Sequence, residues 1–199
     1  LDETVWDFLY SCHFPYALGY GLTETSPLIA GCGPKHKMHK KGYIGKPVKH
    51  DHVILLDKNE EGVGEIAVKG PNVMAGYYNN EELNKEVFTE DGYFKTGDLG
   101  YLDKHGYLSI RGRVKTMILG PAGENIYPES IESLINNMEF VQESLVVPGD
   151  GGLVALIKID LEAMQEKLKI SATDARDEAE KYVVKLKKSV NEQLSTFSK

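Results

Sequence analysis

The residues best suited to chemistry begin with the segment YGLTET at residues 20–25. It combines an aromatic ring, a glycine that permits close approach to the backbone, a hydroxyl and a carboxylate. These groups can stack on a base, hydrogen-bond a phosphate oxygen and bind Mg²⁺. A turn that ends in a threonine cap has the same composition, so this segment alone does not decide between the two interpretations.

Two further segments carry groups that suit a nucleotide. The sequence TGD at residues 96–98 follows GYF at 92–94, and an aspartate past a strand end can accept hydrogen bonds from both hydroxyls of a ribose. An aspartate that simply lies in a turn is the common alternative. Residues 112–132, GRVKTMILGPAGENIYPESIE, fit either a mobile connection with a ligand-facing loop or a β-hairpin with a basic strand.

These segments need elements to position them, and the glycine-rich part of the chain predicts strands. Strand-like runs bounded by Gly, Asp or Asn occupy residues 52–57, 64–70, 92–98 and 106–112. Strong turn signals lie at residues 91–92 and 104–106. Short strands of this kind predict a distorted antiparallel barrel or a small antiparallel sheet.

The pattern changes after Arg113, where we place a domain boundary. A helix is expected from Pro128, followed by two strands that join in a hairpin at residues 150–152 and a long final helix capped by Ser171 or Thr173. The residues that recur on one face of this last helix are Ala175, Ala179, Tyr182, Val183, Leu186, Val190 and Leu194. The expected fold class is α+β, with a β-rich part at residues 1–113 and a small α+β unit at 114–199.

Composition narrows the class of protein. The chain has 199 residues, 41% of them hydrophobic, and a net charge of −7, which argues against disorder and against a nucleic-acid partner. Two cysteines are too few for a disulfide scaffold, and no apolar run is long enough for a membrane span, so we expect a cytoplasmic protein. The pairs His36/His39 and His50/His52 lack a third ligand and are interpreted as solvated surface histidines.

Taken together and in this order, the three segments resemble the adenylate-forming superfamily of acyl-CoA synthetases, luciferases and peptide-synthetase adenylation domains. The resemblance covers nearly the whole chain and includes residues 64–66, 70–78, 88–89 and 91–93. It implies that residues 1–113 are the C-terminal part of the large AMP-binding domain. Residues 114–199 would then be a truncated C-terminal lid domain.

The resemblance also implies roles for matching positions. Tyr20 would pack on adenine beside Gly21, Thr23 would contact the α-phosphate, and Glu24 would bind Mg²⁺. Asp98 would bind the ribose, and Arg113 would make a second ribose or phosphate contact. The hinge would be Lys115, where many members have aspartate, and the loop on the coenzyme A side would contain Gly123, Glu124 and Asn125. Pro121 departs from the usual glycine pair there and should stiffen the loop.

The function implied by the resemblance is ATP-dependent activation of a carboxylic acid and its transfer to coenzyme A. The segments at residues 12–24 and 128–147 look most like the corresponding sequences of bacterial long-chain fatty acid ligases. ATP, Mg²⁺, coenzyme A and a fatty acid are the implied cofactors and partners, and peripheral membrane association for lipid access is left open. The alternatives are an adenylation domain that loads a carrier-protein thiol and a non-catalytic nucleotide-binding module.

Two parts of the family machinery are not recognisable in this sequence. We find no Ser/Thr/Gly-rich phosphate loop ending in lysine, and no residue has the sequence context of the adenylation lysine. Because the chain also opens at Leu1 in an amphipathic run, we interpret it as a fragment. We therefore expect the chain by itself to be inactive in adenylation.

Overall fold

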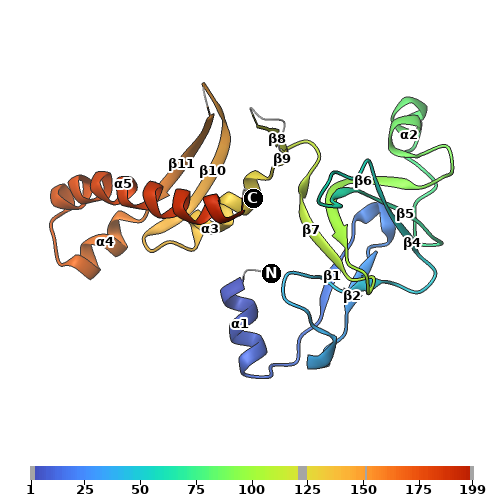
Figure 1. Cartoon of the computed structure of the whole chain (residues 1–199), viewed down its shortest axis with the longest axis horizontal. Helices are drawn as coiled ribbons and strands as arrows, with labels where there is room; N and C mark the ends of the chain where they lie inside the picture. The colour runs from blue at the N-terminus through green and yellow to red at the C-terminus, as the bar shows by residue number, and fades with distance from the viewer. Residues whose placement is uncertain (1–2, 121–124, 151, 198–199) are drawn as a thin grey trace. The chain divides into compact units, whose positions relative to one another are not determined.

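The computed structural model describes residues 3–120, 125–150 and 152–197, and it divides into two compact units, Leu1–Lys115 and Thr116–Lys199 (Figure 1). The division falls close to the boundary expected near Arg113. Among the described residues, no helix combines the length and the apolar character that crossing a membrane requires.

The first unit is built on a four-stranded antiparallel sheet in the order β4-β5-β6-β7 (Figure 1). Its strands are β4 (His52–Leu56), β5 (Gly64–Lys69), β6 (Phe94–Leu102) and β7 (Leu108–Arg113). All four lie where the sequence predicts strands, and the α+β class is confirmed. The order ends at β4 and at β7, so within the described residues the sheet is open and the barrel alternative is wrong.

A second, smaller sheet in this unit was not predicted. It has the order β1-β2-β3, from β1 (Leu18–Tyr20), β2 (Ala30–Cys32) and β3 (Lys46–Pro47). Strands of two or three residues show no alternation that the sequence could reveal. The unit also contains α1 (Glu3–Ser11), α2 (Glu81–Val87) and two 3₁₀ turns, η1 (Thr23–Thr25) and η2 (His36–Met38).

One apolar core ties the two sheets together. Ile29 and Ala30, beside and within β2, are fully buried in the same cluster as residues of all four strands of the larger sheet. The remaining buried members are Leu55, Ile66, Val68, Phe94 and Leu108. Because Ile29 and Ala30 anchor β2, the turn between β1 and β2 is held at a fixed place against the larger sheet.

The second unit packs two helices against a β-hairpin. Its elements are β8 (Ile118–Leu119), β9 (Asn125–Ile126), α3 (Pro128–Asn136), β10 (Val141–Gly149), β11 (Gly152–Ile159), α4 (Leu161–Leu168) and α5 (Ala172–Phe197). The helix from Pro128 and the hairpin are confirmed, with Gly149 paired to Gly152. The core consists of Ile131, Ile135, Val146, Leu186 and Val190.

Three details of the second unit differ from the sequence interpretation. The N–H of Asp174 donates to the Ser171 hydroxyl, so Ser171 and not Thr173 caps α5. Val183 was expected on the apolar face but is 37% exposed. Helix α4 was not predicted, because Met164 is its one buried residue and gives no apolar stripe.

Candidate functional site

The centre of the candidate site is a carboxylate shared between three strands. Asp98 on β6 is 6% exposed, and its Oδ2 accepts a hydrogen bond of 2.8 Å from the Tyr20 hydroxyl at the end of β1. The Nε of Arg113, at the end of β7, lies 3.2 Å from Asp98 Oδ1. The structure therefore brings together three residues that the sequence analysis singled out in separate segments.

Asp98 takes this position because β6 bulges. Between the pairs Glu65↔Leu99 and Ala67↔Lys95, strand β5 contributes one residue and β6 contributes residues 96–98. Gly97 supplies the left-handed backbone conformation that such a bulge needs, with φ +73°. The sequence pattern predicts an aspartate past a strand end, but β6 continues to Leu102, so the bulge and not the strand end redirects the Asp98 side chain.

The backbone groups that the bulge releases find other partners. The Thr96 hydroxyl donates to the Ile66 carbonyl at 2.8 Å and accepts from the Asp98 N–H at 3.1 Å. The Gly97 N–H donates to Glu65 Oε1 at 3.1 Å, and the Gly97 carbonyl accepts from the Val114 N–H at 2.9 Å. Because these groups are satisfied, the bulge is a stable platform for Asp98.

Burial affects the acidity of the tyrosine at this site. Tyr20 is held between β1 and Asp98, and burial raises the pKa of its phenol above the usual value, with the adjacent Asp98 carboxylate acting in the same direction. The phenol therefore stays protonated at neutral pH and acts as a donor. Its hydroxyl fixes one oxygen of Asp98, while the ring remains a flat apolar surface.

The turn after Tyr20 depends on a glycine, but for a reason other than the expected one. A Cβ on Gly21 would lie 1.6 Å from the carbonyl oxygen of Pro27, so the backbone of the same turn occupies that space. The hydroxyl of the fully buried Thr25 accepts from the Leu22 N–H at 3.0 Å. The threonine cap considered as an alternative is therefore present, and it coexists with the chemical groups of the turn.

Glu24 in this turn is held by a segment far along the chain. Its backbone carbonyl accepts from the Met74 N–H at 2.8 Å, and its Oε1 accepts from the Tyr77 hydroxyl at 2.8 Å. This hydrogen bond is the largest cause of the raised pKa of Tyr77. In the sequence, Tyr77 is visible only as part of the family resemblance and has no predicted role, because a tyrosine in a glycine-rich loop carries no signal of its partner.

A second side chain ties the same two segments together. The Asn72 Nδ2 lies within hydrogen-bond distance of the Thr25 carbonyl at 2.9 Å, the Leu28 carbonyl at 2.8 Å and Asp51 Oδ2 at 2.9 Å. The turn is thus braced on both sides of Thr25. Thr23 is exposed on this braced turn, at the start of η1.

The remaining predicted residues lie elsewhere. Lys115 is exposed in the turn after β7 and is the last residue of the first unit. Gly123 and Glu124 lie outside the described residues. Asn125 is half-buried in β9, opposite Leu119, in the second unit.

The histidines correct one sequence interpretation. His39 is 8% exposed, its Nε2 lies 3.0 Å from the Gly33 carbonyl, and its ring packs on Tyr16 with centroids 3.9 Å apart. The half-buried His36 packs on Tyr10 in a tilted arrangement, with centroids 3.8 Å apart. The solvated interpretation is therefore wrong for His39 and only partly right for His36, whereas His50 and His52 are exposed as expected. In the described part of the chain, no three His, Cys, Asp or Glu side chains cluster as a metal site would require.

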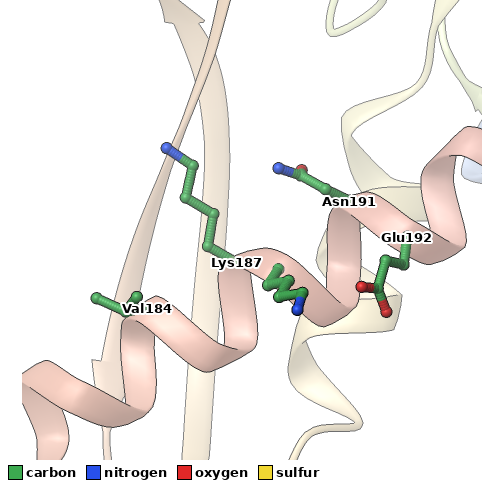
Figure 2. Close-up of a pocket in the computed structure, with 5 residues that line it drawn as sticks. Val184, Lys187, Asn191 and Glu192 are labelled. Carbon is green, nitrogen blue, oxygen red and sulfur yellow. The ribbon is translucent and has the colours of Figure 1, made fainter.

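The second unit has a surface hollow of about 450 Å³, but all its lining residues come from α5 (Figure 2). Val184 there is 71% exposed, and Lys187, Asn191 and Glu192 project from the same helix. A feature formed by one helix lacks the convergent polar groups of a binding site. We therefore place the candidate site in the first unit.

Comparison with known proteins agrees with this placement. Residues 1–78 match the family model described as AMP-binding enzyme. The likeness to this family covers the first 78 residues of the chain. The matched residues include the turn with Tyr20 and Glu24 and the segment with Asn72 and Tyr77, so the family model covers both halves of the braced turn.

Two curated relatives illustrate the likeness. The 2-succinylbenzoate–CoA ligase of Oceanobacillus iheyensis is 36% identical over 178 residues, which cover 88% of this chain and 36% of the relative. The indoleacetate–CoA ligase of Aromatoleum aromaticum is 40% identical over 133 residues, covering 64% of this chain and 26% of the relative. The chain thus spans about a third of these relatives or less.

Solved structures show the same fold. The unliganded O-succinylbenzoate coenzyme A synthetase of Bacillus subtilis matches with a TM-score of 0.70 and 31% identity, over 83% of this chain and 39% of that chain. The same enzyme in complex with ATP and magnesium ion matches with a TM-score of 0.68 and 36% identity, over 78% and 33%. These relatives are named for 2-succinylbenzoate and indoleacetate, so they do not support the expectation of a long-chain fatty acid.

Proposed function

We propose that Tyr20, Thr23, Glu24, Asp98 and Arg113 bind the AMP moiety of ATP, and that the whole protein is an ATP-dependent acyl-CoA ligase. The observation that carries this proposal is the convergence on Asp98. Tyr20 and Asp98 are separated by 78 positions in the sequence, yet they share a hydrogen bond of 2.8 Å, and Arg113 contacts the other oxygen of the carboxylate. Gly21 would contribute to the site by shaping the turn that carries Thr23 and Glu24.

The chemistry of Asp98 suits a ribose diol. A carboxylate offers about four acceptor positions, and Tyr20 and Arg113 use only one on each oxygen. The hydroxyls of a ribose can therefore bind without displacing either partner. The half-buried Tyr20 ring would provide the face on which an adenine stacks.

Glu24 fits the cation that accompanies ATP. Mg²⁺ usually binds proteins through one or two carboxylates, with the substrate phosphates and water supplying its other ligands. A single glutamate with one oxygen held by Tyr77 meets that requirement, and a cluster of three protein ligands is not needed. The cation would neutralise the charge that accumulates when a carboxylate approaches a phosphate.

The relatives support a different acid from the long-chain fatty acid that the sequence suggested. Both named curated relatives act on a carboxylic acid that carries an aromatic ring, and both names specify coenzyme A. We therefore propose an aromatic carboxylic acid as substrate and coenzyme A as acceptor, in place of a fatty acid. The names favour coenzyme A over the thiol of a carrier protein.

The second unit completes this proposal. Residues 114–199 would act as the lid, with Lys115 as the hinge and Gly123, Glu124 and Asn125 in the loop on the coenzyme A side. Such a lid would exchange the surface presented to the nucleotide between the adenylation and thiol-transfer steps. Lys115 is exposed and is the last residue of the first unit, which is compatible with that role.

Calorimetric titration of the purified chain tests the nucleotide site. We expect AMP to bind about tenfold more tightly than its 2′,3′-dideoxy analogue, because Asp98 accepts hydrogen bonds from the ribose. Asp98→Asn should reduce this preference, whereas Asp91→Asn in the exposed turn before β6 should preserve it. Equal binding of the two nucleotides, or no binding of AMP, would contradict the proposal.

An assay of the full-length enzyme tests the substrate. Pyrophosphate release should be supported by 2-succinylbenzoate or indoleacetate in preference to palmitate, and the product should be captured by coenzyme A. A preference for palmitate would restore the fatty-acid interpretation. Transfer only to a carrier protein would overturn the assignment of coenzyme A.

A further inference from the structure

A chain of contacts leads from helix α2 to Glu24 through Tyr77. Glu24 is half-buried in η1, and the Tyr77 hydroxyl donates to its Oε1 at 2.8 Å. The two residues are 53 positions apart in the sequence, so their contact depends on tertiary structure and not on local conformation. Whatever fixes Tyr77 therefore also fixes the Glu24 carboxylate.

Tyr77 lies in a loop, and its backbone is held by the side chain of Asn84. The Tyr77 N–H donates to Asn84 Oδ1 at 2.7 Å, and Asn84 Nδ2 donates to the Tyr77 carbonyl at 3.0 Å. This paired arrangement uses both the acceptor and the donor of one amide on a single residue. It fixes the position of the Tyr77 backbone more narrowly than either hydrogen bond alone.

Asn84 is itself on a rigid element. Helix α2 begins after Asn80, whose Oδ1 accepts from the Leu83 N–H at 3.2 Å. Its last residue, Val87, and the adjoining Phe88 pack against the apolar core of the first unit. Asn84, Tyr77 and Glu24 therefore form a continuous connection from a capped helix to the turn.

The neighbouring tyrosine shows that this arrangement is specific to Tyr77. Tyr78 has the same side chain at the next position, yet it is 93% exposed. Burial and charge therefore distinguish two adjacent tyrosines, and only one of them contacts a carboxylate. Tyr78 provides a matched control for removal of a hydroxyl.

We propose that Tyr77 and Asn84 are positioning residues for the divalent cation that accompanies ATP. The proposal rests on the proposed function, in which Glu24 binds that cation. Tyr77 holds Oε1, so Oε2 of Glu24 would be the oxygen that binds the cation, and Asn84 keeps Tyr77 in place. Mutation of partners that orient a metal ligand in this way typically lowers metal affinity about 10- to 100-fold.

The test measures how much Mg²⁺ strengthens ATP binding by the purified chain. Affinity for ATP is determined by calorimetry in excess Mg²⁺ and in EDTA, for the wild type, Tyr77→Phe, Asn84→Ala and Tyr78→Phe. Removal of the Tyr77 hydroxyl should reduce the strengthening by Mg²⁺ about tenfold. Asn84→Ala should reduce it by a smaller factor, because the hydroxyl remains but its position is less fixed.

The control measurements separate positioning from damage to the fold. In EDTA, the ATP affinity of Tyr77→Phe should stay within about twofold of the wild type, because the base and ribose contacts are untouched. Tyr78→Phe should match the wild type under both conditions. Binding of Mn²⁺ in the presence of ATP, followed by electron paramagnetic resonance, should weaken for Tyr77→Phe and not for Tyr78→Phe.

The possible results are distinct. An equal effect of Mg²⁺ in Tyr77→Phe and Tyr78→Phe would overturn the positioning role and leave the nucleotide site standing. The positioning role would also fall if ATP binds but Mg²⁺ gives no strengthening in the wild type, since Glu24 would then bind no cation. Absence of any ATP binding would overturn both this inference and the proposed function.

Discussion

Asp98 and Arg113 are directly opposed partners on β6 and β7, and the ion pair between them follows from that register. Their Cα atoms are paired in the ladder, and Arg113 Nε lies 3.2 Å from Asp98 Oδ1. The carboxylate is almost fully buried, whereas the arginine side chain is 67% exposed. The pair therefore places a buried negative group beside an exposed positive one at the edge of the candidate nucleotide site.

Replacement of Arg113 by methionine should weaken binding of AMP more than it weakens the fold. The loss of stability should be about 1 kcal/mol, because the arginine side chain is exposed to water and Asp98 keeps its hydrogen bond from Tyr20. Affinity for AMP should fall about tenfold, since the charged partner of a bound phosphate or ribose is lost. Calorimetry and urea unfolding measure the two effects, and Arg111→Met on the same strand is the control that should change neither appreciably.

Gly21→Ala should unfold the turn. The added Cβ would lie 1.6 Å from the Pro27 carbonyl oxygen, and a backbone atom cannot move away as a side chain can. We expect a loss of at least about 3 kcal/mol in the free energy of unfolding, measured in urea. At Gly33 a Cβ would meet only the flexible Met38 side chain, at 3.5 Å or more. Gly33→Ala is therefore the matched control, and a similar loss there would refute the steric explanation.

The sequence predicts the larger sheet well, because its strands show the expected signals. Each of the four runs is rich in β-branched or aromatic residues and ends at a glycine, aspartate or asparagine, so local pattern and final structure agree. The hairpin in the second unit was predictable for the same reason. Helix α4 was not, because a helix with a single buried residue, Met164, has no periodicity to detect.

The candidate site was predictable only in part. Tyr20, Asp98 and Arg113 could be singled out because their residue types suit a nucleotide and their segments resemble a family. Their mutual contacts depend on the bulge at residues 96–98, which exists only when β5 pairs with β6. Tyr77 was missed as a partner of Glu24, because the contact joins residues 53 positions apart through tertiary packing.

The chain by itself should show no ATP–pyrophosphate exchange with any carboxylic acid. Its sequence contains no recognisable phosphate loop and no lysine in the context of the adenylation lysine. This chain should therefore bind AMP without forming an acyl-adenylate. Radiolabelled exchange measures the reaction, with a full-length enzyme of the family as positive control. Exchange above the background of a sample without protein would refute this expectation.

Stability should fall at alkaline pH because of Tyr20. The pKa of Tyr20 is raised in the folded protein by burial, so between the unfolded pKa of about 10 and the higher folded value only the folded state keeps the proton. The stabilisation is therefore complete below about pH 10 and is lost as the pH rises above it, by about 1.4 kcal/mol per pH unit. Urea unfolding at several pH values measures this slope. Tyr20→Phe should flatten it by that amount, whereas Tyr78→Phe, at a position that is 93% exposed, should leave it unchanged. An equal slope in wild type and Tyr20→Phe would show that the phenol of Tyr20 is not shielded from water by the contacts around Asp98.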